Sequence, residues 1–414
     1  MKITNLQTAV VEANFDWTYV RIETDAGVRG LGECFFAPGL PAILRELSRV
    51  LLKEDPRNID LLVRKMQRAA SGAGSTGIVA NAISGIETAL WDILGKSLET
   101  PIYRLLGGKY RDAIRLYADC HGGEGLESLD PLLMSRTPAW SRPAPDAQSR
   151  SLWDTRRESL ERDCTPEAYA ERAQQLAARG FTALKFDVDV PNPYTRDDHN
   201  RCLTNGEIDH MVSLVRAARE AVGPNIDIAV DCHWRYNVTD ILKFAWRCEE
   251  FNLLWLEDPV PPENVSALRE VALRTRTPIC SGENLCYRAA FRELLETRAV
   301  AIVSPDVQKA GGILETRRIA DMADLQYTAV APHNISSPIG TIASAHLCAA
   351  IPNFLALEFH AYDVPFWEEL ASGISKPIIQ GGHIHLGDAP GLGVELNEEI
   401  AWRYRKPGET FFES

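Results

Sequence analysis

The sequence has no excess of basic residues. Its 414 residues include 44 lysines and arginines against 57 aspartates and glutamates, which gives a formal charge of −13 and a pI near 5.3. A protein that binds nucleic acid normally presents a basic patch to the phosphates, and no basic stripe is visible along this chain. The composition therefore argues against a nucleic-acid partner.

Paired cysteines and long apolar runs are also absent. The nine cysteines are scattered and none belongs to a Cys-x-x-Cys pair, so neither a zinc site nor a disulfide framework is indicated. No stretch approaches the roughly 20 apolar residues of a membrane span, and the N-terminus has no sustained apolar run. We therefore expect a cytoplasmic protein in a reducing compartment, with no membrane partner.

What the sequence does contain is three acidic residues at equal intervals. Asp231, Glu257 and Glu283 each end a short apolar run, and successive members are 26 residues apart. One strand, one helix and two short loops take about that many residues. Three carboxylates at the same end of three adjacent parallel strands would form an oxygen-rich cavity of the kind that binds magnesium.

The same period continues towards the C-terminus. Asp306, His333 and Glu358 follow at intervals of 23, 27 and 25 residues, each at the end of another apolar run. Active sites of (β/α) barrels are built from such strand ends. A histidine beside an aspartate suggests a base with the partner that orients it, and His233, two residues after Asp231, lies on the same side of its strand as a second acid or base.

Eight apolar runs alternate with helical patterns, which is the number that a closed (β/α) barrel requires. The expected strands are residues 114–118, 183–186, 227–230, 253–256, 278–280, 301–303, 328–331 and 354–357. Two connections, 121–163 and 191–205, are longer than a barrel needs, and we interpret them as parts of a lid over the strand ends.

The first part of the chain has a different pattern. Two β-rich runs are joined by the turn Asp25-Ala26-Gly27, and helical patterns follow over residues 42–70 and 79–94. We expect an α+β domain over residues 1–113, the barrel over 114–378, and a C-terminal segment over 379–414. The strands and turns of residues 381–396 are expected to return to the N-terminal unit.

Several motifs together resemble the mandelate racemase subgroup of the enolase superfamily, and most of all its sugar-acid dehydratases. They occur in order at barrel spacing and cover nearly the whole chain: residues 82–96, 105–108, 255–259, 281–284, and 305–306 through 311–312. The resemblance implies a modified TIM barrel of the (β/α)7β type, with an α+β capping domain built from the N-terminal region and the C-terminal tail. It also implies a Mg²⁺-dependent lyase that removes the C2 proton of a sugar acid and eliminates the C3 hydroxyl.

The resemblance also assigns roles by position. Asp231, Glu257 and Glu283 match the Mg²⁺ ligands, His333 and Asp306 the catalytic dyad, Glu358 the residue that binds the substrate carboxylate, and His233 the general acid of several dehydratases. Removal of a proton next to a carboxylate creates a dianion, which a divalent cation and a hydrogen-bond donor must stabilise. A protonated Glu358 would be such a donor.

The second strand bears on which reaction is catalysed. It ends in Lys185-Phe186-Asp187, where racemases and cycloisomerases of the family carry Lys-x-Lys. Asp187 removes the obvious second base, so epimerisation is disfavoured, and Lys185 and Asp187 are candidates for substrate binding. A plain salt bridge between these two residues is the competing interpretation.

The substrate is a small sugar acid, aldonic or aldaric, that the sequence does not identify further. Trp234 and Arg235 are candidates for the pocket wall, together with residues near Asp16-Trp17 and Phe35-Phe36, and Trp140, Arg142, Trp153 and Arg156 of the first long connection. By analogy with the family we expect a homo-oligomer. An acid-sugar epimerase, and a binding or regulatory protein with little activity, remain the alternative functions.

Overall fold

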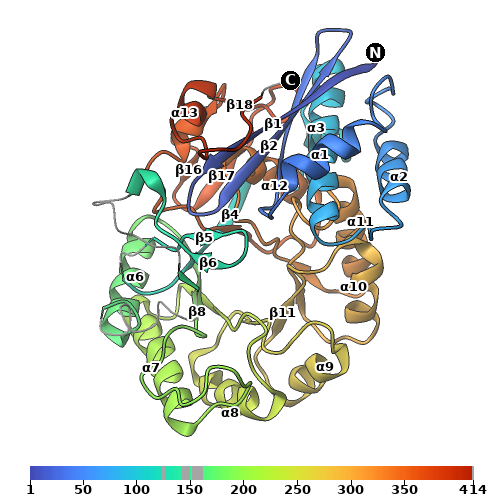
Figure 1. Ribbon diagram of the computed structural model, residues 1–414. Coiled ribbons are helices and arrows are strands. Elements are labelled where there is room, and N and C mark those ends of the chain that lie inside the picture. Colours follow the sequence, from blue (N-terminus) through green and yellow to red (C-terminus); the bar gives the residue numbers. More distant parts are fainter. Residues whose placement is uncertain (124–125, 142–149, 152–161, 413–414) are drawn as a thin grey trace.

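The computed structural model describes residues 1–123, 126–141, 150–151 and 162–412. Eight parallel strands form a closed barrel in the second part of the chain (Figure 1). The ring closes where β14 pairs with β4, and where Val330 of β13 bridges to Phe354 just before β14. The barrel strands are β4 (Ala113–Cys120), β8 (Ala183–Asp187), β9 (Asp227–Asp231), β10 (Leu256–Glu257), β11 (Ile279–Ser281), β12 (Ile302–Val303), β13 (Ala329–Val330) and β14 (Leu357–Phe359).

In the part of the chain that the structure describes, seven helices connect these strands and surround the barrel, and Figure 1 shows most of them as an outer ring. They are α6 (Pro166–Ala178), α7 (Asn205–Val222), α8 (Val238–Cys248), α9 (Val265–Arg274), α10 (Tyr287–Glu296), α11 (Ile313–Asp324) and α12 (Pro338–Ala350). A short 3-10 turn, η2 (Glu249–Phe251), extends α8. All eight strands expected from the sequence are present, and the (β/α)7β barrel is confirmed.

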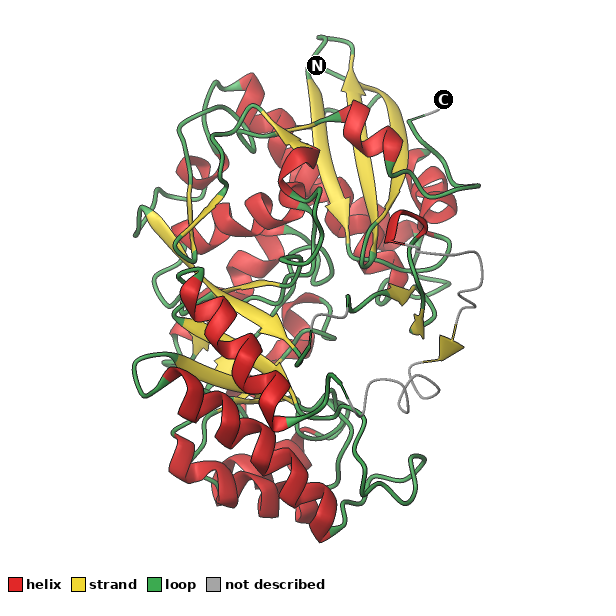
Figure 2. Ribbon diagram, turned by 90° about the vertical axis from the view of Figure 1, so that its left-hand side faces the viewer, coloured by secondary structure: helices red, strands yellow, loops and turns green. Residues whose placement is uncertain are grey.

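The N-terminal part is the α+β unit that the sequence predicts. Its antiparallel sheet has the order β1 (Ile3–Glu12), β2 (Asp16–Thr24) and β3 (Arg29–Cys34), and it is packed by α1 (Leu40–Ser48), α2 (Ile59–Ala69), α3 (Ile78–Ser97) and α4 (Ile102–Leu105); Figure 2 shows this sheet beside the barrel. Glycine permits α3 to approach β3 closely, because a Cβ at Gly32 would lie 2.0 Å from the carbonyl oxygen of Gly85. The helical pattern over 42–70 forms two helices, and the chain turns between them at Lys53, where φ is 69°.

Two buried carboxylates fasten this unit to the barrel. Glu33 of β3 accepts hydrogen bonds from the backbone N–H groups of Ser337 and Gly340 at the start of α12, both at 2.9 Å. Glu87 of α3 accepts from the first two N–H groups of α11, at 2.7 and 2.9 Å. Helix N-termini attract negative charge and offer free N–H groups. Since α11 and α12 begin after the carboxyl ends of β12 and β13, the N-terminal unit is held at the end of the barrel where strand ends form sites.

The C-terminal part contacts both units. The hairpin of β16 (Ile379–Gln380) and β17 (His383–His385) pairs with the start of β4, with Ile384 opposite Ile114. Residues 381–396 therefore do not all return to the N-terminal unit as expected, because the start of β4 extends beyond its barrel neighbours and its backbone groups need partners. Further on, Arg405 and Phe411 bridge to β1. Between these lie η3 (Glu368–Leu370), β15 (Ala371–Ser372), β18 (Glu395–Leu396) and α13 (Glu398–Arg403).

The first long connection forms a small sheet of β5 (Leu129–Asp130), β6 (Met134–Ser135) and β7 (Arg150–Ser151), with a 3-10 turn, η1 (Ala139–Ser141). It is tied to the N-terminal unit, since Arg136 forms ion pairs with Glu12 and Asp16, both at 3.0 Å. None of the nine cysteines forms a disulfide, and no described helix has both the length and the apolar character to cross a membrane. The domain boundaries after residues 113 and 378 stay predictions.

Candidate active site

The side chains inside the barrel form layers, because alternate residues of a strand point to the same side. An apolar layer takes one residue from each strand or the residue beside it: Tyr117, Ala183, Ala229, Trp255, Cys280, Ile302, Ala331 and Ala356. Two residues further along six of these strands, the side chains are ionisable and buried: Asp119, Lys185, Asp231, Glu257, His333 and Glu358. The candidate site therefore lies directly on an apolar layer, where charges interact strongly.

The three regularly spaced carboxylates converge. Asp231, Glu257 and Glu283 are buried, and each offers an oxygen within 4.8 Å of the others'. The indole N–H of Trp255 donates to Glu257 at 2.6 Å, which fixes that side chain. Burial raises the pKa of Glu257 well above its usual range, and the neighbouring carboxylates add to this effect while Lys185 opposes it. A compact set of carboxylate oxygens is the donor set that Mg²⁺ prefers, so the residues fit the ion that the sequence predicts.

Lys185 lies among four carboxylates. Its ammonium nitrogen is 2.8 Å from Asp231, 3.0 Å from Glu257, 3.1 Å from Glu358 and 3.6 Å from Asp119. Burial disfavours its charge, but these carboxylates raise the pKa of Lys185 well above its usual range. Among the described contacts, the salt bridge to Asp187 that the sequence left open is not formed. Lys185 instead neutralises part of the metal triad, at a position where it can also reach a bound carboxylate.

His333 and Asp306 form a dyad beside the triad. Nδ1 of His333 lies 2.7 Å from Asp306, and because a carboxylate only accepts, Nδ1 carries the proton. Nε2 then faces Glu283 at 3.7 Å and Glu358 at 3.8 Å. Although burial opposes it, these carboxylates raise the pKa of His333 to about 9. The backbone N–H of Gln308 donates to the other oxygen of Asp306 at 2.7 Å and orients the dyad further.

The surroundings of Glu358 and Asp119 shift the pKa values of these two carboxyl groups in opposite directions. Burial opposes ionisation of Glu358, but Lys185 and His333 bring its pKa down to about 2. Burial raises the pKa of Asp119 well above its usual range, and the nearby carboxylates of Asp187 and Glu358 add to this effect. The ammonium group of Lys185, 3.1 Å away, favours the ionised form of Glu358, whereas the hydrogen bond considered from the sequence would need a protonated Glu358.

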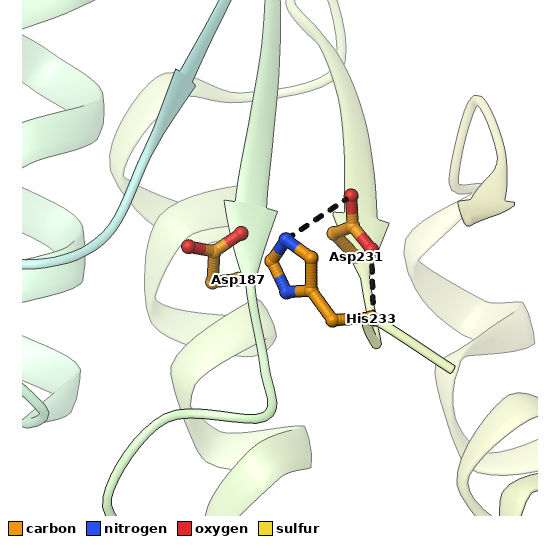
Figure 3. Close-up of side chains that lie close together, drawn as sticks. All are labelled: Asp187, Asp231 and His233. Carbon is orange, nitrogen blue, oxygen red and sulfur yellow. Dashed lines mark hydrogen bonds and ion pairs between the residues drawn. The ribbon is translucent and has the colours of Figure 1, made fainter. Parts of the chain in front are cut away.

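His233 projects into the cavity beside the triad. Figure 3 shows its ring between Asp187 and Asp231. Its Nδ1 lies 3.0 Å from Asp189, so Nδ1 carries a proton and Nε2 faces Asp231 at 3.9 Å. Burial opposes the charged ring, but the three aspartates raise the pKa of His233 well above its usual range. The backbone here has φ of 40°, a left-handed conformation that is uncommon for non-glycine residues and is frequent at functional sites.

Asp187, Asp231 and His233 also form a second group that could hold a cation. Oδ1 of Asp187 is buried and has no hydrogen-bond partner. Trp234 and Arg235, the predicted wall residues, both line the cavity. Arg235 donates to the backbone carbonyl of Asp189 at 3.1 Å and so braces the segment that follows β8.

A cavity of about 1150 Å³ opens above these residues. Its wall combines the barrel strand ends, both long connections, and three aromatic residues of the N-terminal unit (Phe15, Phe35 and Phe36). This is the surface at which the two connections were expected to act as a lid. Of the other expected wall residues, Trp17 and Trp140 instead donate to the backbone of Ile335 and Glu12, and Asp16 pairs with Arg136. Arg142, Trp153 and Arg156 lie outside the described residues.

Some residues of the site were not singled out from the sequence. Asp119 had a usable signal, since it follows the first expected strand as the other polar strand ends do. His360 lies two residues after Glu358 and competes with it for the same role, and matching by position favours Glu358. Glu127 had no signal, because it lies in a long connection without periodicity, yet its carboxylate is 2.9 Å from His360.

Comparison with known proteins agrees with this geometry. Residues 5–107 match the mandelate racemase/muconate lactonizing enzyme N-terminal domain, and residues 168–400 match the enolase C-terminal domain-like family. A D-xylonate dehydratase of Haloferax volcanii is 42% identical over 100% of this chain and 91% of its own length. A D-galactonate dehydratase of Pectobacterium atrosepticum is 30% identical over 97% of this chain and 93% of its own.

A solved structure gives the same result for the fold. The crystal structure of a mandelate racemase/muconate lactonizing enzyme-like protein from Rubrobacter xylanophilus superposes with a TM-score of 0.88 at 44% identity, covering 100% of this chain and 99% of that one. Both domains are matched, and both relatives are dehydratases. The chain therefore belongs to the mandelate racemase/muconate lactonizing enzyme family of the enolase superfamily, and it is an enzyme of the hydro-lyase class.

Proposed function

We propose that the protein is a Mg²⁺-dependent dehydratase of an aldonic acid, with D-xylonate as the first substrate to test. The observation that carries this proposal is the placement of two oriented histidines beside different members of the buried carboxylate triad. His333, held by Asp306, lies 3.7 Å from Glu283, and His233, held by Asp189, lies 3.9 Å from Asp231. Elimination of water from a sugar acid needs a base at C2 and an acid at C3, and two histidines with carboxylate partners can supply both. The similarity to the D-xylonate dehydratase of Haloferax volcanii, at 42% identity, supports the choice of substrate.

Asp231, Glu257 and Glu283 would hold the ion. When bound, Mg²⁺ would supply positive charge that stabilises the substrate carboxylate as the C2 proton leaves, and it would offset the Glu283 charge that raises the pKa of His333. Lys185 lies where its ammonium group can bind the same carboxylate. Glu358 lies 3.1 Å from the ammonium group of Lys185 and 3.8 Å from Nε2 of His333, so we assign it to holding these two groups in place rather than to donating a hydrogen bond.

His333 removes the C2 proton through Nε2, because Nδ1 is occupied by Asp306. His233 keeps its own Nδ1 on Asp189 and gives a proton from Nε2 to the departing C3 hydroxyl. The resulting enol then tautomerises to a 2-keto-3-deoxy acid. Asp187 stands where the racemases of the family carry a second lysine base, and its presence disfavours epimerisation. His233 could still return a proton to the opposite face of C2.

Proton NMR in D₂O with Mg²⁺ tests the proposal on D-xylonate and a set of other aldonic and aldaric acids. We expect a 2-keto-3-deoxy product from the intact protein, and none above background from His333→Asn, which retains a hydrogen-bonding side chain but no base. His233→Asn should slow loss of water while C2 proton exchange continues, because the two steps use different residues. Deuterium at C2 of recovered substrate without loss of water would instead indicate an epimerase. No turnover and no exchange with any acid would overturn the dehydratase proposal.

A further inference from the structure

A second cluster of polar residues lies on the cavity wall across the barrel from Glu257 and Glu283, and its innermost member, Asp119, is 3.6 Å from Lys185. Nε2 of His360 is 2.9 Å from Glu127 of the first long connection and 3.9 Å from Asp119 of β4. The side-chain amide of Asn14 lies 3.2 Å from Nδ1 of His360. With the amide nitrogen as donor, Nδ1 accepts and Nε2 carries the proton towards Glu127. Three distant parts of the chain therefore fix one imidazole at the cavity wall.

Several polar atoms of this wall have no partner. Oδ1 of Asp119 and the hydroxyl of Ser128 are buried without a hydrogen bond, and both residues line the cavity at only 5% exposure. A buried polar atom without a partner is unfavourable, so such atoms commonly mark the place of a ligand group or a bound water. The free positions include carboxyl and hydroxyl oxygens, which can accept hydrogen bonds from the hydroxyl groups of a polyol.

The cluster is placed for the far end of a substrate. In a ring of eight strands the fourth faces the eighth and the fifth faces the first, so Glu257 and Glu283 lie across the barrel from the strands of His360 and Asp119. A sugar acid whose carboxylate lies near the triad and Lys185 can extend its hydroxyl chain across the cavity to this wall. Phe15 closes the wall, with its ring 5.3 Å from that of His360.

We propose that Glu127, His360 and Asp119 form a distal subsite, which binds the terminal hydroxyl groups of an aldonic acid and rejects the second carboxylate of an aldaric acid. This inference rests on the proposed function and specifies its substrate class. Glu127 is the specificity-determining residue, because its charge opposes a carboxylate placed beside it. Burial would favour the neutral form of Glu127, but the contact with His360 holds its pKa at about 2, so the charge is present at neutral pH.

The test compares D-xylonate with two matched acids, one carrying a carboxylate at C5 and one lacking the C5 hydroxyl. kcat/KM for the three acids is measured for the wild type, Glu127→Gln and His360→Asn. His385→Asn is the control, since this exposed histidine of β17 lies where the chain pairs with the start of β4, at the other end of the barrel.

We expect Glu127→Gln to raise the preference for the diacid over D-xylonate by roughly tenfold or more, because like charges at close range are strongly unfavourable. We expect His360→Asn to reduce the preference for D-xylonate over the deoxy acid by a similar factor, since a site built to bind a hydroxyl rejects the analogue that lacks it. C2 proton exchange should continue in both variants, which separates this subsite from the dyad.

Unchanged preferences in both variants, with normal circular dichroism, would overturn the proposal. If the wild type turns over none of the acids, the proposed function fails separately. In that case, the preference among the three acids is measured instead as the ratio of their dissociation constants, by calorimetry with Mg²⁺ present. Binding of the diacid as tight as that of D-xylonate, or no binding of either acid, would also overturn the subsite.

Discussion

Replacement of Lys185 by methionine would remove the one ammonium group described among the four carboxylates of the barrel interior. Methionine keeps the length and apolar stem of lysine, so the change acts mainly on charge. At an effective dielectric constant of about 20, unit charges about 3 Å apart attract each other by roughly 5 kcal/mol, and Lys185 has three such contacts. Most of this attraction is offset by desolvation, and loss of one partner from a buried ion pair costs about 3–5 kcal/mol.

We therefore expect Lys185→Met to lower the free energy of unfolding by about 3–5 kcal/mol in EDTA at pH 8. The loss should shrink at acidic pH. Without lysine, mutual repulsion raises the folded-state pKa of the carboxylates, so stability falls as pH rises through those values. Saturating Mg²⁺ should recover part of the loss, because a cation bound only by the folded protein stabilises it.

Urea unfolding, followed by tryptophan fluorescence with and without Mg²⁺, measures this effect. The control is Lys243→Met, since Lys243 is 45% exposed in its ion pair with Asp240 and should change stability by less than about 1 kcal/mol. A loss below about 1 kcal/mol for Lys185→Met in EDTA would refute the reasoning, because removal of three buried ionic contacts should lower the free energy of unfolding by more than that. A loss that Mg²⁺ leaves unchanged would argue against a cation site at the triad.

Three further predictions concern the dyad and the contact between the two domains. Asp306→Asn should lower kcat about 10²–10⁴-fold with little change in KM, because His333 loses the carboxylate that fixes its proton on Nδ1, and an unchanged kcat in steady-state assays would contradict the dyad. Burial raises the pKa of Glu87 from 4.5 to about 7, so the folded protein binds this proton more tightly than the unfolded chain does. The stability that this group contributes, up to roughly 3 kcal/mol, is fully present below pH 4.5 and is lost as pH rises through 7. The urea midpoints measured at pH 5 and at pH 8 should therefore differ less for Glu87→Gln than for the wild type. Gly312→Ala should destabilise the protein by about 2–4 kcal/mol in thermal unfolding, because φ is 93° and the new Cβ would lie 2.2 Å from Glu87, and a loss below about 1 kcal/mol would show that the contact relaxes easily.

The sequence predicted the barrel well, because strand ends repeat at a nearly constant interval. That period places Asp231, Glu257 and Glu283 on one rim, and it also brings His333 to Asp306. Period-2 alternation puts His233 on the same side as Asp231. These relations depend only on local chain geometry, so one sequence is sufficient to predict them.

Relations between distant segments could not be predicted in this way. Glu127 reaches His360 across 233 residues, from a connection whose conformation no pattern specifies. The protonation of Glu358 depends on where the ammonium group of Lys185 settles among several carboxylates, and that is decided by packing in three dimensions. Attachment of the hairpin of β16 and β17 to β4 likewise depends on which backbone groups the barrel leaves unpaired.

Residues 404–412 pair with β1, and this pairing has a consequence for the protein during translation. β1 lies at the edge of the N-terminal sheet, and residues 404–412 are hydrogen-bonded to it. During translation this edge is made before residues 404–412, so it stays uncovered while the whole barrel emerges from the ribosome. An uncovered edge strand can pair with another chain, and the nascent protein is therefore exposed to aggregation at this edge until residues 404–412 have been made.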